Sequence, residues 1–147
     1  MIVYEGPGDI FRSPAQTLVC PVNTKGVMGN GLALAFSQRF PGLLDVYKEY
    51  CQSGQFKVNS LLLLNRVLCF PTKDEFWRAS QLEWIDANLA KLAATYMQHD
   101  IRSLAVPGLG CGKGQLSLSE VGPLVYQHLD PLPIDVYFYT SRAPHMR

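Results

Sequence analysis

The glycine-rich stretch Val22–Gly31, with the sequence VNTKGVMGNG, constrains the fold more than any other part of this chain. It follows the apolar run Thr17–Val22, which has the composition of a strand buried on both faces. Its glycines, Gly26, Gly29 and Gly31, precede a segment with helical periodicity. A strand, a glycine loop and a helix in this order present bare backbone N–H groups and the positive end of the helix to an anion. A tight strand-to-helix turn without a ligand is the alternative interpretation.

The spacing of these glycines excludes the two common phosphate-binding motifs, because the stretch contains neither GxGxxG nor GxxxxGK[ST]. The polar side chains of Asn23, Thr24 and Asn30 lie among the glycines and suit the hydroxyl groups of a sugar. A nucleotide-like ligand, held by its ribose and its phosphates together, is the hypothesis that follows.

A second glycine loop, Pro107–Gly114, follows the apolar run Ser103–Val106. Ligands of open α/β sheets bind outside the carboxyl ends of the strands. Because each glycine loop follows a buried strand, we expect both loops to face one cleft.

Strand and helix patterns alternate along the chain, which predicts an α/β fold. One helix has a predicted capping box, formed by Ser80 and Glu83, at its start. Another contains Pro123, which a helix tolerates only in its first turn. The predicted strands are Ile2–Tyr4, Thr17–Val22, Val58–Leu64, Val67–Phe70, Ser103–Val106 and Ile134–Tyr139, and the predicted helices start at Gly31, Leu43, Ser80 (ending near His99) and Ser117 or Ser119.

Composition narrows the class of protein. The chain has 147 residues, of which 48% are hydrophobic and 17% charged, as in a single globular domain. The net charge of +1 argues against a protein that holds long duplex DNA mainly through phosphate contacts, but leaves a short contact with nucleic acid open.

The four cysteines form no CxxC pair, and with the three histidines they lack the spacing of a zinc site. We therefore expect no metal, no cofactor and a reduced, cytoplasmic protein. The start of the sequence has no signal-peptide pattern, and its longest apolar run, Leu61–Leu64, is too short to span a membrane.

Three segments together resemble the macrodomain family. They are GDIF at Gly8–Phe11, VNTKGVMGNGLALAFSQRFP at Val22–Pro41, and VPGLGCGKGQL at Val106–Leu116. With FPTK at Phe70–Lys73, they are most similar to the branch that holds the DarG antitoxin macrodomain and the terminal ADP-ribose glycohydrolase of animals. The resemblance implies one macrodomain over residues 1–147, a three-layer α/β/α sandwich around a mixed, mostly parallel sheet.

The resemblance also implies a function: removal of ADP-ribose from a modified substrate, here single-stranded DNA, by a monomer that reverses the action of a cognate ADP-ribosyltransferase toxin. Two alternatives stay open. One is a module that binds ADP-ribose without cleaving it, and the other is a hydrolase of protein-linked or small-molecule ADP-ribose derivatives.

Carried over by motif, the binding residues follow the ligand from base to distal ribose. Asp9, Ile10 and Tyr139 are assigned to the adenine, and Asn23 to the distal ribose. Gly26–Gly31 are assigned to the pyrophosphate and the distal ribose, and Gly108–Gly114 to the other side of the phosphates. Two of these assignments have an equally open alternative: Asp9 as the cap of a turn, and Tyr139 as a residue of the core. The predicted ADP-ribose-binding residues are Asp9, Ile10, Asn23, Gly26, Val27, Met28, Gly29, Asn30, Gly31, Gly108, Gly110, Cys111, Gly112, Lys113, Gly114 and Tyr139.

Lys73 is the residue to which the resemblance assigns the chemistry. An amine with a lowered pKa captures the opened sugar as a Schiff base. A solvated loop lysine is the alternative. The carboxylate that the animal enzyme carries after its GCG is absent here, where Lys113 and Gly114 follow Gly112, and this departure favours a DarG-like substrate. Phe76 and Trp77 are predicted either to stack on a DNA base or to pack their loop onto the core.

Overall fold

The computed structural model describes residues 1–75, 78–112 and 114–140. The predicted Phe76 and Trp77 stacking pair and the predicted ligand contact of Lys113 lie outside these residues. The strands are β1 (Ile2–Pro7), β2 (Thr17–Val22), β3 (Leu62–Leu64), β4 (Val67–Pro71), β5 (Ser103–Val106) and β6 (Asp135–Thr140). The helices are α1 (Gly31–Arg39), α2 (Leu43–Gln52), α3 (Leu82–Thr95) and α4 (Leu118–Leu129), with a short 3-10 helix at Ile10–Arg12.

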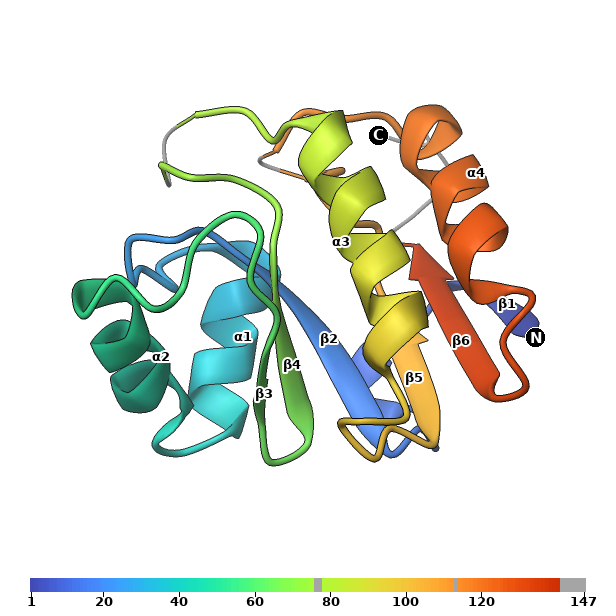
Figure 1. Cartoon of the computed structure of the whole chain (residues 1–147), viewed down its shortest axis with the longest axis horizontal. Helices are drawn as coiled ribbons and strands as arrows, with labels where there is room; N and C mark the ends of the chain where they lie inside the picture. The colour runs from blue at the N-terminus through green and yellow to red at the C-terminus, as the bar shows by residue number, and fades with distance from the viewer. Residues whose placement is uncertain (76–77, 113, 141–147) are drawn as a thin grey trace.

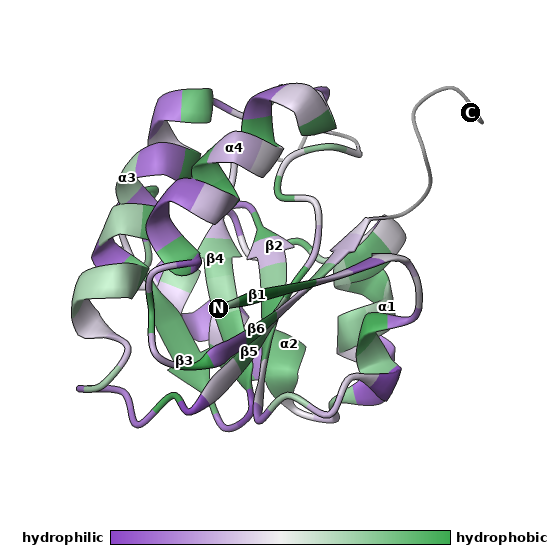
Figure 2. Cartoon of the chain, turned by 90° about the vertical axis from the view of Figure 1, so that its right-hand side faces the viewer, coloured by the Kyte–Doolittle hydropathy of each residue, from purple (hydrophilic) through white to green (hydrophobic). Residues whose placement is uncertain are grey.

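The strands form one sheet in the order β1-β6-β5-β2-β4-β3. All neighbouring strands are parallel except β3, which runs antiparallel to β4. Helices α3 and α4 cover one face of the sheet, and α1 and α2 cover the other (Figures 1 and 2). This arrangement confirms the predicted three-layer α/β/α sandwich with a mixed, mostly parallel sheet.

Alternation along β6 shows how the sheet divides the apolar residues between two cores. Val136 and Phe138 pack under α3 and α4, whereas Tyr137 and Tyr139 pack on the side of α1 and α2. This division follows from strand geometry, because successive strand residues point to opposite faces of the sheet. Within the described residues, no helix has the length and apolar character needed to cross a membrane.

The predicted strand boundaries were wrong by more than one residue in two places, and those of β4 and β6 differ by one residue. Strand β1 does not stop at Tyr4, because an irregularity between Tyr4 and Gly6 lets its pairing with β6 continue through Pro7. Strand β3 begins only at Leu62, and residues 58–61 lie outside the strand. An edge strand needs pairing on one side only, so apolar composition alone does not fix its length.

Two helix predictions also need correction. The predicted capping box of Ser80 and Glu83 is wrong, because α3 begins at Leu82 after Gln81 and makes no side-chain cap bond. It ends at Thr95, short of His99. Helix α4 has the true capping box, between Ser117 and Glu120.

Pro123 lies in the second turn of α4, beyond the position that was expected to tolerate it. Proline there removes the bond to the carbonyl group four residues earlier, that of Ser119. Both residues are exposed, so water can satisfy that carbonyl.

Candidate functional site

A cavity of about 610 Å³ opens at the carboxyl ends of β2, β4, β5 and β6. Both glycine loops line it, the first through Gly29 and Gly31 and the second through Gly108 and Gly112. Strands β2 and β5 are parallel neighbours, which brings the loops that follow them together. The structure therefore places the two loops over one cleft, as the sequence predicted.

Most of the predicted site residues lie at this cavity. Among the described residues, Asp9, Gly26 and Met28 are the predicted ones that do not line it. Several lining residues were not predicted, including two in the first turn of α1. The predicted residues that line the cavity are Ile10, Asn23, Val27, Gly29, Asn30, Gly31, Lys73, Gly108, Gly110, Cys111, Gly112, Gly114 and Tyr139, and the additional ones are Gly8, Pro21, Val22, Leu32, Ala33, Thr72, Pro107, Leu118 and Thr140.

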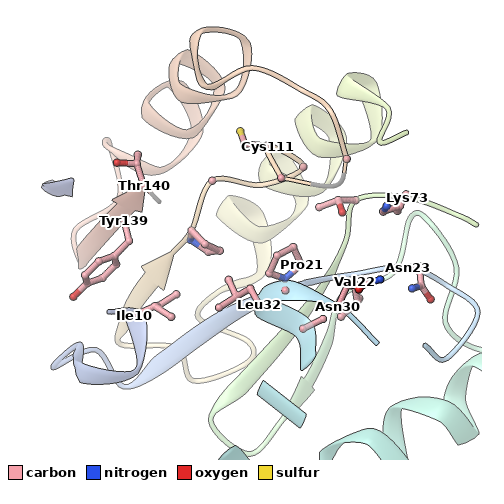
Figure 3. Close-up of a pocket in the computed structure, with 18 of the residues that line it drawn as sticks. Ile10, Pro21, Val22, Asn23, Asn30, Leu32, Lys73, Cys111, Tyr139 and Thr140 are labelled. Carbon is pink, nitrogen blue, oxygen red and sulfur yellow. The ribbon is translucent and has the colours of Figure 1, made fainter. Parts of the chain in front are cut away.

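The cavity has two chemically different ends. Figure 3 shows Ile10 and Tyr139 at one end and Asn23 and Lys73 at the other. Tyr139 is 8% exposed and approaches the backbone so closely that a Cβ on Gly8 would lie 3.2 Å from its ring. The cavity thus has an apolar end, a glycine-lined middle and an amine at the far end, and the order of base, phosphates and distal ribose along it stays a prediction.

Asp9 has a structural role in this structure. Its Oδ1 accepts a hydrogen bond of 3.0 Å from the backbone N–H of Phe11, at the start of the 3-10 helix. This is the turn cap that the sequence left open as an alternative. The cap holds Ile10 in place at the cavity, and a contact between Asp9 and adenine stays a prediction.

Gly26 and Met28 pack the first glycine loop against the rest of the fold. Gly26 has a φ of 81°, and a Cβ there would lie 3.2 Å from Cγ and 3.4 Å from Cα of Lys48 on α2. Met28 is 3% exposed and packs in the core beneath the loop. Both residues therefore fix the path of the loop against the fold.

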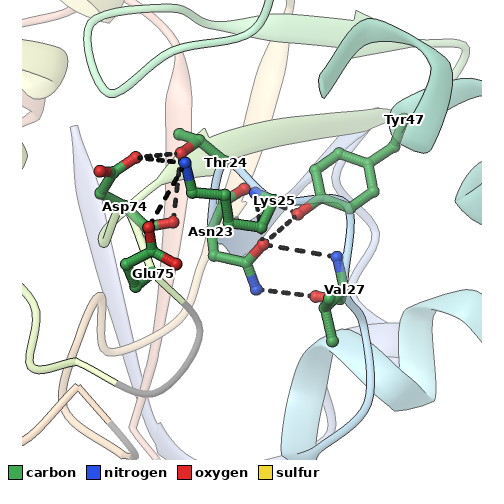
Figure 4. Close-up of polar contacts among 7 residues, drawn as sticks. All are labelled: Asn23, Thr24, Lys25, Val27, Tyr47, Asp74 and Glu75. Atoms are coloured by element: carbon green, nitrogen blue, oxygen red, sulfur yellow. Dashed lines mark hydrogen bonds and ion pairs between the residues drawn. The ribbon is translucent and has the colours of Figure 1, made fainter. Parts of the chain in front are cut away.

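Asn23 ties the first loop together (Figure 4). Its Nδ2 donates to the carbonyl oxygen of Val27 at 2.8 Å, and its Oδ1 accepts from the backbone N–H of Lys25 at 2.9 Å. These bonds use one of the two amide N–H groups, so the other suits a ligand hydroxyl. The sequence predicted the ligand contact of Asn23 and missed its part in closing the loop.

Tyr47 supports Asn23 from α2. Its hydroxyl lies 2.7 Å from the backbone oxygen and 2.9 Å from Oδ1 of Asn23, and the side chain is fully buried. Burial is the main cause that raises the pKa of Tyr47, so the hydroxyl stays protonated and serves as a donor. The helix thus fixes the loop through one buried hydroxyl group.

We expect Tyr47→Phe to lower the free energy of unfolding by about 1–2 kcal/mol, because the acceptors on Asn23 lose a buried donor. Binding of ADP-ribose should weaken in the same variant, since the loop loses its support. Tyr50→Phe is the matched control, because Tyr50 is half-buried and packed on the same helix, and its hydroxyl makes no hydrogen bond to the described part of the chain. Urea denaturation and calorimetry measure the two effects, and equal stability of both variants would contradict this role of Tyr47.

Lys73 lies in the loop that follows β4 and lines the cavity. The preceding residue is fixed to the neighbouring strand, because the N–H of Thr72 donates to the carbonyl oxygen of Val22 at 2.9 Å. The two residues that follow Lys73 are the carboxylates Asp74 and Glu75. They form partly exposed ion pairs with Lys25, at 3.8 and 3.4 Å (Figure 4).

The second glycine loop packs on the segment before α3. The N–H of Ser80 donates to the carbonyl oxygen of Gly114 at 2.9 Å. Gly110 has a φ of 73°, and a Cβ there would lie 3.0 Å from the side chains of Ile85 and Leu116. Only glycine fits such a position, which explains the glycine without a ligand. Among the described residues, the buried Ser80 Oγ has no hydrogen-bond partner.

Comparison with known proteins adds to this geometry. The family model for the Macro domain matches residues 19–125. A DNA ADP-ribosyl transferase–DNA ADP-ribosyl glycohydrolase fusion protein of Thermosipho africanus is 35% identical over 90% of this chain and 40% of its own length. The chain spans about two fifths of the length of the curated relatives that it matches first.

Solved structures show the same fold. The macrodomain of Mycobacterium tuberculosis DarG is 34% identical, with a TM-score of 0.87 over 95% of this chain and 97% of that one. Thermosipho africanus DarTG in complex with ADP-ribose is 35% identical, with a TM-score of 0.88 over 95% of this chain and 42% of that one.

Proposed function

Because the chain belongs to the macrodomain family, we propose that it is an ADP-ribosyl glycohydrolase that removes ADP-ribose from modified DNA. The names of the relatives support this proposal, since they describe DNA ADP-ribosyl glycohydrolases and a DarTG protein with ADP-ribose bound. The fusion of transferase and glycohydrolase in one relative supports a cognate ADP-ribosyltransferase as the source of the substrate. Single-stranded DNA is the proposed carrier of the modification.

The observation that carries the proposal is the order of groups along the cavity. Ile10 and Tyr139 offer apolar surface to a base at one end, and Lys73 lies at the other. Between them the two glycine loops bring bare backbone close to the space that a diphosphate would fill. Backbone N–H groups in such loops can donate hydrogen bonds to an anion. A ligand with a base, two phosphates and a second sugar matches this sequence of surfaces.

Lys73 is the proposed catalytic residue. When the bond at C1″ of the distal ribose breaks, the positive charge spreads over C1″ and the ring oxygen. As this bond breaks, the deprotonated amine of Lys73 adds to C1″, and the DNA base departs with the bonding electrons and takes up a proton. Opening of the sugar ring at the bond between C1″ and the ring oxygen then gives a Schiff base, in which C1″ is doubly bonded to the lysine nitrogen. Addition of water to the Schiff base releases ADP-ribose and returns the amine.

A panel of substrates tests the proposal. We expect release of ADP-ribose from single-stranded DNA that is modified on thymine or on guanine, and slower release from protein that is modified on glutamate or serine. Free ADP-ribose derivatives test the small-molecule alternative, which predicts that they are hydrolysed faster than modified DNA. If calorimetry shows tight binding of ADP-ribose and no substrate is cleaved, the protein is a binding module and not an enzyme.

A further inference from the structure

Hydrogen bonding between β2 and β4 continues past the ends of the two strands. Their last paired residues are Val22 and Pro71. Beyond this pair, the N–H of Thr72 donates to Val22 at 2.9 Å, and the N–H of Thr24 donates to the carbonyl oxygen of Asp74 at 3.2 Å. The residues on both sides of Lys73 are therefore fixed to the same neighbouring segment.

The side chain of Thr24 adds a second tie to Asp74 (Figure 4). Its hydroxyl lies 3.1 Å from the carbonyl oxygen of Asp74 and is also in contact with the Asp74 carboxylate. Thr24 is 7% exposed, so its hydroxyl donates from a buried position. A hydroxyl that bonds to a charged group contributes more than a neutral pair does.

The ion pairs of Lys25 are the weaker part of this contact. The side chains of Lys25, Asp74 and Glu75 are 44%, 49% and 30% exposed in these pairs. Exposed ion pairs contribute little, because water and salt screen them. The buried hydroxyl of Thr24 is consequently the group that fixes Asp74.

We propose that Thr24 is a positioning residue for the reaction, acting on Lys73 through Asp74. The inference rests on the proposed function and adds a residue to it. A catalytic group needs to be held within about 0.5 Å of its productive position. The bonds at Thr72 and Asp74 fix the backbone of Lys73 on both sides, and only the contact at Asp74 includes a side-chain hydrogen bond, from the Thr24 hydroxyl, that a substitution can remove.

Thr24→Val tests this role, because valine keeps the shape of threonine and the backbone bond but removes the hydroxyl. Thr24→Ser keeps the hydroxyl and should restore the function. Thr95→Val is the matched control, since Thr95 also donates a hydroxyl bond, of 2.8 Å to Lys91 on α3, and does not line the cavity.

In single-turnover assays on ADP-ribosylated DNA, Thr24→Val should lower the rate of the chemical step by about ten- to a hundredfold, the cost of a misplaced catalytic group. Its affinity for ADP-ribose should stay close to that of the unchanged protein. Thr24→Ser and Thr95→Val should both react at nearly the normal rate. An unchanged rate in Thr24→Val, or a parallel loss of rate and affinity, would overturn the positioning role.

A second measurement keeps this inference separate from the proposed function. After reductive ¹³C-methylation of the lysines, the NMR signal of Lys73 is identified by its absence in Lys73→Arg. Saturation with ADP-ribose should shift this signal strongly in the unchanged protein and in Thr24→Ser. The shift should be weak in Thr24→Val at the same saturation. Equal shifts in all three would refute the inference, whereas absence of turnover by the unchanged protein would refute only the glycohydrolase function.

Discussion

Replacing Lys73 with alanine is expected to lower the release of ADP-ribose from modified DNA by about a thousandfold, or roughly 4 kcal/mol of transition-state stabilisation. The amine is the proposed nucleophile, and alanine offers no group that can form a Schiff base. Lys73 lies at the end of the cavity, away from the surfaces proposed for the base and the phosphates. Affinity for ADP-ribose should therefore change much less than the rate.

Two further variants separate charge from nucleophilicity. Lys73→Arg keeps a cation that cannot lose its proton at neutral pH, so it should be as inactive as Lys73→Ala. Lys57→Ala removes a lysine that does not line the cavity and should leave the rate unchanged. Single-turnover rates on the DNA substrate give the comparison.

The Schiff base itself can be trapped. Borohydride added during turnover should reduce the C=N bond and leave the sugar covalently attached to the protein, which mass spectrometry detects. The adduct should map to Lys73 and be missing in Lys73→Ala. Full activity in Lys73→Ala, or an adduct on another lysine, would remove this mechanism.

The backbone frame of the site followed from local sequence patterns. Thr17–Val22 and Ser103–Val106 read as buried strands, and each precedes a glycine loop. Parallel neighbouring strands bring such loops to the same edge of a sheet. That rule uses only local composition and the order of elements, which a single sequence contains.

The ties between distant loops did not follow from the sequence. Thr24 and Asp74 are 50 residues apart, and their contact depends on the register of β2 against β4. Similarly, Ser80 and Glu83 have the spacing of a capping box, but the N–H of Ser80 bonds to Gly114 instead. Both contacts are created by the tertiary structure, which overrides local propensity and which a local sequence pattern does not contain.

Gly114→Ala is expected to have the second large effect, through the packing of the second loop. A Cβ at this position would meet the Ser80 hydroxyl and would lie 2.5 Å from the carbonyl oxygen and 2.9 Å from Cα of Gly110. The backbone of Gly110 cannot move aside as a flexible side chain can, so the loop itself must shift. Overpacking of this kind costs about 1–3 kcal/mol or more, which lowers the melting temperature by several degrees.

The same shift should abolish ADP-ribose binding, because the loop lines the cavity and would leave its place beside the space proposed for the diphosphate. Gly112→Ala is the matched control for stability, since a Cβ there meets no atom within 4 Å and its φ is not positive. Thermal melting without ligand and calorimetry with ADP-ribose measure the two effects. Equal melting temperatures for Gly112→Ala and Gly114→Ala would contradict the packing of the loop on Ser80.

A double variant shows which contact limits the loop. Ser80→Ala in the Gly114→Ala background removes the hydroxyl that the new methyl group meets, but leaves the carbonyl oxygen of Gly110 in place. We expect part of the stability to return and the affinity to stay low, because the backbone contact still displaces the loop. Neighbouring residues give non-additive changes in such a cycle. Full recovery of binding would mean that Ser80 alone confines Gly114, and that the close approach of the two glycines is not required for the phosphate site.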